Sequence, residues 1–336
     1  MRQLAERFAN LAANSDDQAC MAIGDRIIGV SLHYSGDQRG ARQSIDRMLA
    51  RYIVPQHRRD IVSFKLDQRV MACATLARVL WLQGFPDQAT SMAQSNIDDA
   101  RTVGHGLSLC YSLVEAACPV ALFAGDLVVT DRCVTMLLDQ AARHGLAVWH
   151  AWGRCFEAVL RIRRGDFDAG VRLLRAALDA ACKISFTRHH TPFLGALAEG
   201  MAAAGQLAQA LATIDEALTY AERNETRWYQ AELWRIKGEL LLLKGAQNAI
   251  ATAEGYFMEA ADLARRQGAL SWELRSATSL ARLRYGENRT AEAHAALAPI
   301  YAKFTEGLET ADVKAAGALL AVLAPAAKRT TGRRPT

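Results

Sequence analysis

Histidine and cysteine are the residue types in this sequence that most readily ligate metal ions or take part in catalysis, but few of them lie close together. His189 and His190 are the only adjacent histidines. Because neighbouring side chains of a helix or loop point in different directions, we expect a surface pair rather than a metal site. The segment His57–Asp60 (HRRD) falls in a long connection and could bind an anion, although a solvated loop is the simpler expectation.

The seven cysteines are scattered, and no two of them form a CxxC pair. Most fall in apolar stretches, where a thiol behaves as a small hydrophobic group. An odd, dispersed set fits a reducing compartment better than a disulfide framework. The N-terminus has no apolar signal segment and about 18 apolar residues never follow one another, so we expect a cytoplasmic protein without membrane contact. The cysteines are Cys20, Cys73, Cys110, Cys118, Cys133, Cys155 and Cys182.

The sequence motifs that mark common enzyme classes are missing. No GxxxxGK[ST] segment could hold a nucleotide phosphate, and neither GxSxG nor HExxH occurs. Carboxylates are plentiful, but no two of them stand apart as a general acid–base pair. We therefore expect no catalysis, no cofactor and no metal ion.

The remaining candidates are side chains that could contact a protein or peptide ligand. They occur 13, 10, 6 or 3 residues before regularly spaced glycines, where we expect helices to face a concave groove. Their charges suggest a groove that is basic near its N-terminal end and acidic near its C-terminal end, and Trp and Arg are typical of interface hot spots. The candidates are Arg26, His33, Arg78, Trp81, Glu115, Trp152, Glu199, Glu232, Arg235, Glu239 and Glu273.

The tryptophans allow two interpretations. Trp81 and Trp152 could line the groove or pack between adjacent repeats, and the sequence leaves both open. We expect Trp228, Trp234 and Trp272 in the core between repeats, because an aromatic ring buries a large apolar area.

The elements that must position these side chains are revealed by the glycines. The glycines at 36, 84, 125, 165, 205, 245 and 286 follow one another at steps of 48, 41, 40, 40, 40 and 41 residues. Each is flanked by helical patterns of apolar residues, so the period indicates a stacked helical repeat in which each glycine joins two helices.

Small residues recur at fixed distances from these glycines. A small side chain lets paired helices approach closely, and this spacing is similar to that of tetratricopeptide repeats, in longer units. Seven residues before each glycine stand Gly29, Ala77, Cys118, Ala158, Ala198, Gly238 and Ser279. Five residues after it the residues are again mostly small: Ala41, Ala89, Thr130, Gly170, Ala210, Ile250 and Ala291. We predict an all-α fold, a right-handed superhelical solenoid of about seven tetratricopeptide-like helix pairs with a C-terminal capping helix.

The period also predicts how the chain is divided. Residues 1–13 form either the second helix of a truncated repeat or an N-terminal cap, and both interpretations remain open. Residues 14–306 hold the seven repeats, 307–324 the capping helix and 325–336 a basic, disordered tail. Prolines add two expectations: Pro119 kinks the first helix of its repeat, and Thr191 with Pro192 begins another as its N-cap.

Hydrophobic residues make up 51% of the chain, which suits a helical protein with ample apolar surface to bury. Lysine and arginine number 40 against 35 aspartates and glutamates. Because this small excess is spread along the chain, apart from the basic tail, we expect no direct binding of nucleic acid.

Several segments together resemble one family of bacterial proteins. They are WLQGFPDQA, SLCYSLVEAACPVALFAGD, HGLAVWHAWGRCFE, WRIKGELLLLKG, ARRQGALSWELRSATSLARL and APIYAKFTEGLETADVKAA. The chain resembles the C-terminal helical-repeat region of large transcriptional regulators that join a winged-helix DNA-binding domain to a P-loop signalling ATPase. The resemblance implies a sensor or protein-interaction region. It carries over neither DNA binding nor ATP hydrolysis, because both reside in upstream domains that this sequence lacks.

We therefore expect a non-enzymatic interaction or sensor scaffold, the regulatory repeat region of a bacterial transcriptional regulator. Its partners would be a protein or peptide in the concave groove and an ATPase or winged-helix partner at the N-terminal face. Two alternatives remain open. One is a small-molecule effector sensor, with a pocket between repeats and the connection at 54–66 as a lid. The other is a remnant of a split regulator gene.

Overall fold

The computed structural model describes residues 18–52, 66–182, 189–245 and 247–324 of the 336-residue chain. The predicted helix at 1–13, the segment His57–Asp60 and the basic tail at 325–336 lie outside the described residues, as does nearly all of the 54–66 connection. These expectations stay predictions.

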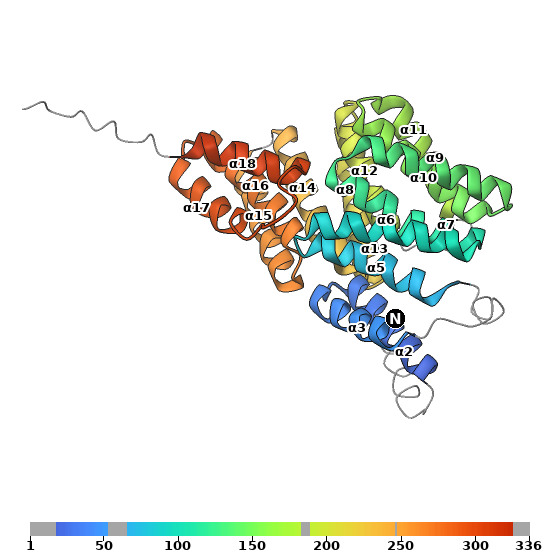
Figure 1. Ribbon diagram of the computed structural model, residues 1–336. Helices are drawn as coiled ribbons and strands as arrows, with labels where there is room; N and C mark the ends of the chain where they lie inside the picture. The colour runs from blue at the N-terminus through green and yellow to red at the C-terminus, as the bar shows by residue number, and fades with distance from the viewer. Residues whose placement is uncertain (1–17, 53–65, 183–188, 246, 325–336) are drawn as a thin grey trace, which may run out of the picture.

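The described residues form helices joined by short turns and contain no strand. Successive helices pack against each other as pairs, so the predicted all-α solenoid of tetratricopeptide-like helix pairs is confirmed (Figure 1). The pairs are α2 (Gln18–Ser35) with α3 (Gln38–Arg51), α5 (Gln68–Leu82) with α6 (Pro86–Val103), α7–η1–α8 (Gly106–Ser112, Leu113–Ala117, Cys118–Ala124) with α9 (Leu127–Arg143), α10 (Ala147–Arg163) with α11 (Phe167–Cys182), α12 (His190–Ala203) with α13 (Leu207–Arg223), η2–α14 (Arg227–Tyr229, Gln230–Lys244) with α15 (Ala249–Gln267), and α16 (Leu270–Gly286) with α17 (Thr290–Tyr301). The last described helix is α18 (Ala311–Leu323).

The turns inside the first five pairs share one hydrogen-bond pattern. At Gly36, whose φ is +98°, the N–H donates to the carbonyl of His33 at 3.1 Å. The next N–H, of Asp37, donates to the carbonyl of Leu32 at 2.9 Å. These two bonds satisfy carbonyls at the end of the first helix and require a left-handed residue between the helices. Glycines 84, 125, 165 and 205 occupy the same position with positive φ.

The small residues before the turns lie where two helices approach closely. A Cβ added to Gly29 would lie 2.6 Å from Cδ1 of Ile45 in α3, and one added to Gly238 would lie 2.6 Å from Cε1 of Phe257 in α15. Real Cβ atoms essentially never come that close to another heavy atom, so a larger residue would force the helices apart. The predicted reason for small residues is confirmed at both positions.

The last predicted turn is misplaced by two residues. Gly286 lies inside α16 and has no positive φ, and the left-handed position belongs to Asn288, with φ +61°. Counting five residues from Asn288 leads to Ala293, which is fully buried, whereas the predicted Ala291 is exposed. Asparagine is the residue other than glycine that most easily adopts this conformation, which explains the displacement.

The turn of the sixth pair also has asparagine in a left-handed conformation. Gly245 ends α14 as predicted, but Asn248 follows with φ +67° and immediately precedes α15. The buried alanine is again five residues later, at Ala253, and the predicted Ile250 is 42% exposed. Asn248 and Asn288 are 40 residues apart, so the 40-residue period of the turns is kept with asparagine in place of glycine.

Pro119 has a different effect from the predicted kink. The helix widens before it into the π-helical turn η1, in which the Cys118 N–H donates to the carbonyl of Leu113, five residues earlier. A π turn accommodates the residues that the proline would otherwise displace from the α-helical ladder. The predicted N-cap is also wrong, because α12 starts at His190 and Thr191 is buried inside it.

The stretch Gly106–Ala124 is long and apolar enough to cross a membrane by length and composition alone. Of its most apolar window, 78% is buried inside the fold. This is the placement of a core helix, and burial against other helices accounts for its apolar character.

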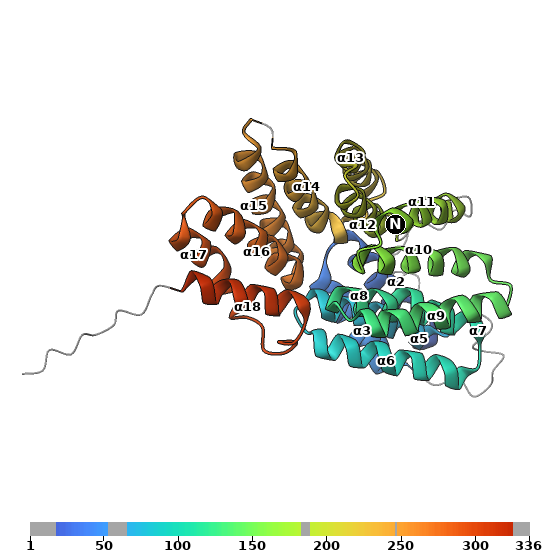
Figure 2. The same ribbon diagram turned by 90° about the horizontal axis from the view of Figure 1, so that it is seen from above.

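The solenoid curls until its C-terminal helices reach its N-terminal helices. The Ser271 hydroxyl donates to the Trp81 carbonyl at 2.5 Å, and the ring centroids of Trp81 and Trp272 lie 4.8 Å apart. Figures 1 and 2 show α16 and α18 beside the ends of α5, α6 and α8. We call this contact of α16–α18 with α5, α6 and α8 the seam. It closes the concave face upon itself.

The three C-terminal helices also have a hydrophobic core of their own. Trp272, on α16, instead belongs to the large core that runs through the other pairs. The C-terminal core comprises Leu274, Ala277, Ala281, Ala293, Leu297, Ile300, Phe304, Val313, Ala316 and Leu323. We refer to α16–α18 as the C-terminal unit.

Candidate functional site

A cavity of about 370 Å³ remains where the curled solenoid does not close completely. Its walls come from α8, α10, α12, α14 with η2, α16 and α18, so nearly every contributing pair presents its first helix. We call it the central cavity. One wall is apolar, formed mainly by Leu122, Phe123, Phe156, Phe193, Trp228 and Tyr229. The other is polar, with Arg163, Glu199, Arg235, Arg275, Arg282 and Asp312.

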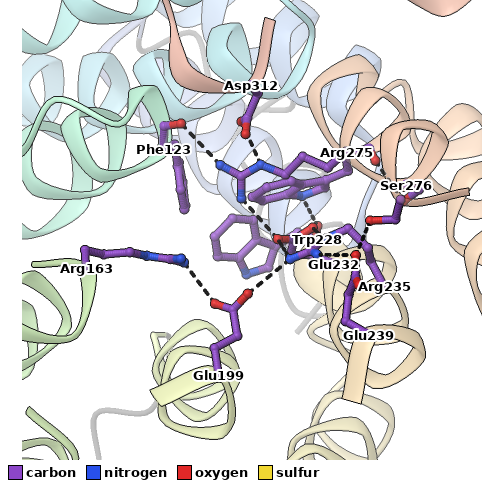
Figure 3. A network of polar contacts seen from close by, with 12 residues as sticks. Phe123, Arg163, Glu199, Trp228, Glu232, Arg235, Glu239, Arg275, Ser276 and Asp312 are labelled. Atoms are coloured by element: carbon purple, nitrogen blue, oxygen red, sulfur yellow. Dashed lines mark hydrogen bonds and ion pairs between the residues drawn. The ribbon is translucent and has the colours of Figure 1, made fainter. Parts of the chain in front are cut away.

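Glu199 on α12 links the arginines of two neighbouring pairs (Figure 3). It accepts hydrogen bonds from Arg163 on α10 at 2.9 Å and from Arg235 on α14 at 3.2 Å. Arg235 also donates two bonds to Glu232, one turn earlier on its own helix, at 2.8 and 2.9 Å. Burial alone would raise the pKa of Glu232, but Arg235 and Arg275 outweigh it and hold that pKa below its ordinary value.

Arg275 is the side chain that joins the largest number of elements at the cavity. It donates to the carboxylate of Asp312 on α18 at 2.7 Å, to Glu232 on α14 at 3.1 Å, and to the carbonyl of Phe123 on α8 at 3.2 Å (Figure 3). Burial opposes its charge, yet Asp312 and Glu232 keep the pKa of Arg275 above its ordinary value.

The same guanidinium lies over two rings of the seam, 5.3 Å from the centroid of Trp81 and 4.9 Å from that of Trp272. Cation–π contacts of this kind add to the ion pairs when the group is withdrawn from water. Arg275 therefore belongs both to the cavity wall and to the seam.

A second ionic cluster lies deeper and does not reach solvent. Arg78 on α5 and Glu115 in η1 pair at 2.8 Å, and both side chains are almost completely buried. The Tyr34 hydroxyl accepts from Arg78 and donates to Glu115, each at 3.1 Å. His189, before α12, lies 3.1 Å from the other oxygen of Glu115. The cluster ties four pairs together, and of its four members only His189 lines the central cavity.

His33 lies beside this cluster in a neutral form. Burial, together with the charge of Arg78, lowers the pKa of His33 to about 3. Its Nδ1 lies 2.8 Å from Oε1 of Gln38, whose amide nitrogen donates to the carbonyl of His33. Because the Gln38 oxygen can only accept, Nδ1 carries the proton of the neutral ring.

Most of the predicted groove residues are buried within the fold. Those with buried side chains are His33, Arg78, Trp81, Glu115, Trp152, Glu232 and Glu273. Those that are half-buried are Arg26, Glu199, Arg235 and Glu239. Only Glu199 and Arg235 of this set line the central cavity. The remainder contact other parts of the same chain, because the curled solenoid brings its own helices into the space that a ligand was predicted to fill.

The tryptophans follow the core interpretation. Trp152 stacks on Phe193 of the next pair, with centroids 5.6 Å apart, and Trp81 packs in the seam. Trp228 and Trp272 are buried as predicted, whereas Trp234 is half-buried. Packing between pairs therefore accounts for both tryptophans whose place the sequence left open.

The predicted change from a basic to an acidic groove is not observed. Arg235, Arg275 and Arg282 of the C-terminal pairs line the cavity, and Glu232 pairs with two of them. Arg275 and Arg282 are absent from the predicted groove residues because the spacing from Gly286 does not lead to them. Counting 13 and 6 residues back from Asn288 leads to both arginines.

The adjacent histidines are not a surface pair. Both are buried, His189 against the cavity wall and His190 against Tyr220, with ring centroids 4.7 Å apart. Burial lowers the pKa of His190. Within the described part of the chain, no three His, Cys, Asp or Glu residues are arranged to hold a metal ion.

Comparisons with known proteins find similarity at the level of fold. No protein-family model matches the sequence, and a search of curated proteins finds no relative. A signal-transduction ATPase with numerous domains and a tetratricopeptide repeat sensor, from Pyrococcus horikoshii, superimposes with a TM-score of 0.48 at 10% identity. That match covers 96% of this chain and 49% of the other, so the chain spans about half the length of that protein.

Two further solved structures are similar to a comparable degree. The apo form of RapI has a TM-score of 0.45 at 10% identity and covers 80% of this chain and 98% of that one. Yeast Tom70 has a TM-score of 0.43 at 14% identity and covers 96% and 58%. These likenesses concern helical-repeat architecture and assign no site to this chain.

Proposed function

We propose that this chain is a non-catalytic sensor scaffold whose ligand occupies the central cavity. The observation that carries the proposal is the composition of the walls, with aromatic rings on one side and arginines on the other. Ligand pockets typically have volumes of about 300–1,000 Å³ and combine an apolar lining with a few placed polar groups. The central cavity, at about 370 Å³, falls within that range.

The charges of the cavity favour an anionic ligand with an apolar or aromatic body. Four arginines line the cavity against two carboxylates, Glu199 and Asp312. Arg163, Arg235 and Arg275 are engaged by those carboxylates and by Glu232. Arg282 is exposed to the cavity, and no carboxylate of the described residues pairs with it. We therefore assign Arg282 as the first contact of the ligand's anionic group.

The closed concave face favours a compact ligand over an extended one. An extended peptide along the whole groove would need side chains such as Arg78 and Trp81, which are buried. A small organic acid, or the carboxyl end of a peptide chain, presents the same chemistry in a volume that the cavity can hold. The small-effector alternative is thus favoured over a long peptide groove.

We further propose that the scaffold is the regulatory repeat region of a bacterial transcriptional regulator. The resemblance of six segments to such regulators supports this, and in them the repeat region is the sensor or interaction part. An ATPase or winged-helix partner would then contact the N-terminal face and receive the signal of cavity occupancy.

A thermal-shift panel tests the proposed ligand class. The panel holds aromatic carboxylates, their amides, and short peptides with free or amidated C-termini. A ligand present at about 100 times its dissociation constant adds roughly 2.7 kcal/mol to stability, so a true ligand raises Tm clearly. Shifts with free acids and none with amides support the proposal, and free peptides alone would identify a chain end as the ligand. Equal melting curves across the panel contradict it.

A further inference from the structure

The helix α6 is capped from a distant part of the chain. It begins at Pro86, and its N-cap residue, Phe85, offers no side-chain hydrogen bond. The carboxylate of Glu306 supplies that bond from 219 residues away, accepting from the N–H groups of Asp87 at 3.0 Å and Gln88 at 3.1 Å. A carboxylate at a helix N-terminus satisfies otherwise unpaired donors and interacts favourably with the helix dipole.

The contact is reciprocal and fits closely. The Gly307 N–H donates to the carboxylate of Asp87 at 3.0 Å, and the Gln88 side-chain amide donates to Glu306 at 2.9 Å. Gly307 has φ +67°, and a Cβ added to it would lie only 1.9 Å from Cγ of Pro86. We call the contact of Glu306 and Gly307 with Asp87 and Gln88 the clasp. It is part of the seam.

The clasp is joined directly to a wall of the central cavity. The Thr310 N–H and hydroxyl both donate to the carbonyl of Gly307, and α18 starts at the next residue. Ala311 and Asp312, in the first turn of α18, line the cavity, and Asp312 holds Arg275. The C-terminal unit therefore forms one wall of the cavity and contacts α6 through the hydrogen bonds of the clasp.

The internal core of the C-terminal unit suits it to movement as one body. Phe304 precedes the clasp and Val313 follows it, and both are buried in the core of the C-terminal unit rather than in the seam. Movement of α18 alone would expose Val313, whereas movement of the whole unit keeps this core intact. Rigid-body rotation about an interface is an established type of conformational change, and here it would separate the rings of Trp81 and Trp272 as well as opening the polar contact.

We propose that the seam is a gate to the central cavity, which the C-terminal unit opens as one body and the clasp holds shut. The proposal rests on the proposed function only for the cavity being a ligand site. A ligand anion beside Arg275 competes with Asp312 for the same guanidinium, so occupancy and closure are coupled. By linkage, the factor by which the ligand changes the closure equilibrium equals the ratio of its affinities for the closed and open states.

The clasp itself is tested by amide hydrogen exchange on the protein without ligand. The N–H groups of Asp87 and Gln88 stand in the first turn of α6, where the helix supplies no acceptor. In Glu306→Ala, we expect these two amides to exchange about tenfold faster or more than in the wild type. Glu306→Gln keeps one acceptor and should show a smaller effect. Glu309→Gln is the matched control, because Glu309 lies in the same segment but pairs with Lys314.

The gate is tested by the distance between spin labels at Ser91 on α6 and Ala318 on α18, both exposed. Cys20 and Cys182 are replaced by serine so that only the introduced cysteines react, since the other described thiols are buried. We expect one distance in the wild type and in Glu309→Gln, and an added longer-distance population in Glu306→Ala. If Glu306→Ala exchanges faster at Asp87 and Gln88 but its spin-label distance distribution equals that of the wild type, the clasp caps α6 without controlling any movement. This result would overturn the gate.

Two other outcomes separate the gate from the proposed function. If Glu306→Ala leaves the exchange of Asp87 and Gln88 unchanged, the clasp does not exist in solution and the gate is rejected. If the labels separate but no aromatic carboxylate shifts Tm in any variant, the gate stands and the assignment of the cavity as a ligand site fails.

Discussion

At the residue scale, the inner face of the solenoid is an arrangement of arginines and carboxylates that satisfy one another. Arg78 with Glu115 joins helices of two neighbouring pairs, and Arg275 with Asp312 joins α16 to α18. Sequence position alone identified Arg78 and Glu115 as inward-facing, but it could not show that they face each other. That depends on the rotation between neighbouring pairs, which no local pattern records.

The buried pair of Arg78 and Glu115 gives the first prediction. Glu115→Gln leaves the Arg78 charge buried without its counter-ion, so we expect a loss of about 3–5 kcal/mol in the free energy of unfolding, measured with urea. Replacing both residues, by Arg78→Met with Glu115→Leu, should recover most of that loss. A double variant as unstable as the single one would show that the pair is not the main source of the effect.

His33 gives a prediction about pH. Its pKa is about 3 in the folded protein and 6.5 in the unfolded chain, so below pH 6.5 the unfolded chain binds the additional proton. Stability is therefore fully present above pH 6.5 and is lost as the pH falls towards 3. Between pH 7 and pH 5 this loss amounts to about 2 kcal/mol. In His33→Gln, which cannot titrate, we expect the free energy of unfolding to fall by that much less over the same interval.

At the element scale, the helix pairs were predictable because their joints depend on local chemistry. A glycine in a left-handed turn with small residues around it produces the same joint five times, from Gly36 to Gly205. The two joints where asparagine replaces glycine were misplaced, and Arg275 and Arg282 were missed as a result. The π turn before Pro119 could not be predicted either, because a proline inside a helix is compatible with both a kink and a widened turn.

The displaced joint predicts opposite effects for two neighbouring residues. Gly286 lies in a helix with open space around its Cα, so Gly286→Ala should stabilise the protein by about 0.5–1 kcal/mol. Asn288 carries the left-handed turn, so Asn288→Ala should destabilise it by about 1 kcal/mol, while Asn288→Gly should not. Thermal or urea unfolding of the three variants checks this order. Destabilisation by Gly286→Ala would contradict this assignment and support the turn that the sequence predicts at Gly286.

At the scale of the whole molecule, a predicted open groove is replaced by a closed solenoid with a central cavity. Curvature accumulates from small rotations between successive pairs, and those rotations depend on packing that the repeat pattern does not specify. The seam is the outcome, and residues as distant as Asp87 and Glu306 meet there. We propose that this closure leaves a cavity in which Arg282 receives an anion.

Calorimetric titration with the aromatic carboxylate that gives the largest thermal shift measures binding in this cavity. We expect one binding site per chain, and an affinity about tenfold weaker or more in Arg282→Gln, since a hydrogen bond to a charged group contributes roughly 1.5–3 kcal/mol. Arg266→Gln, which removes an exposed arginine of α15 outside the cavity, should bind like the wild type. Equal affinities for the wild type and both variants would contradict the assignment of the central cavity as the binding site.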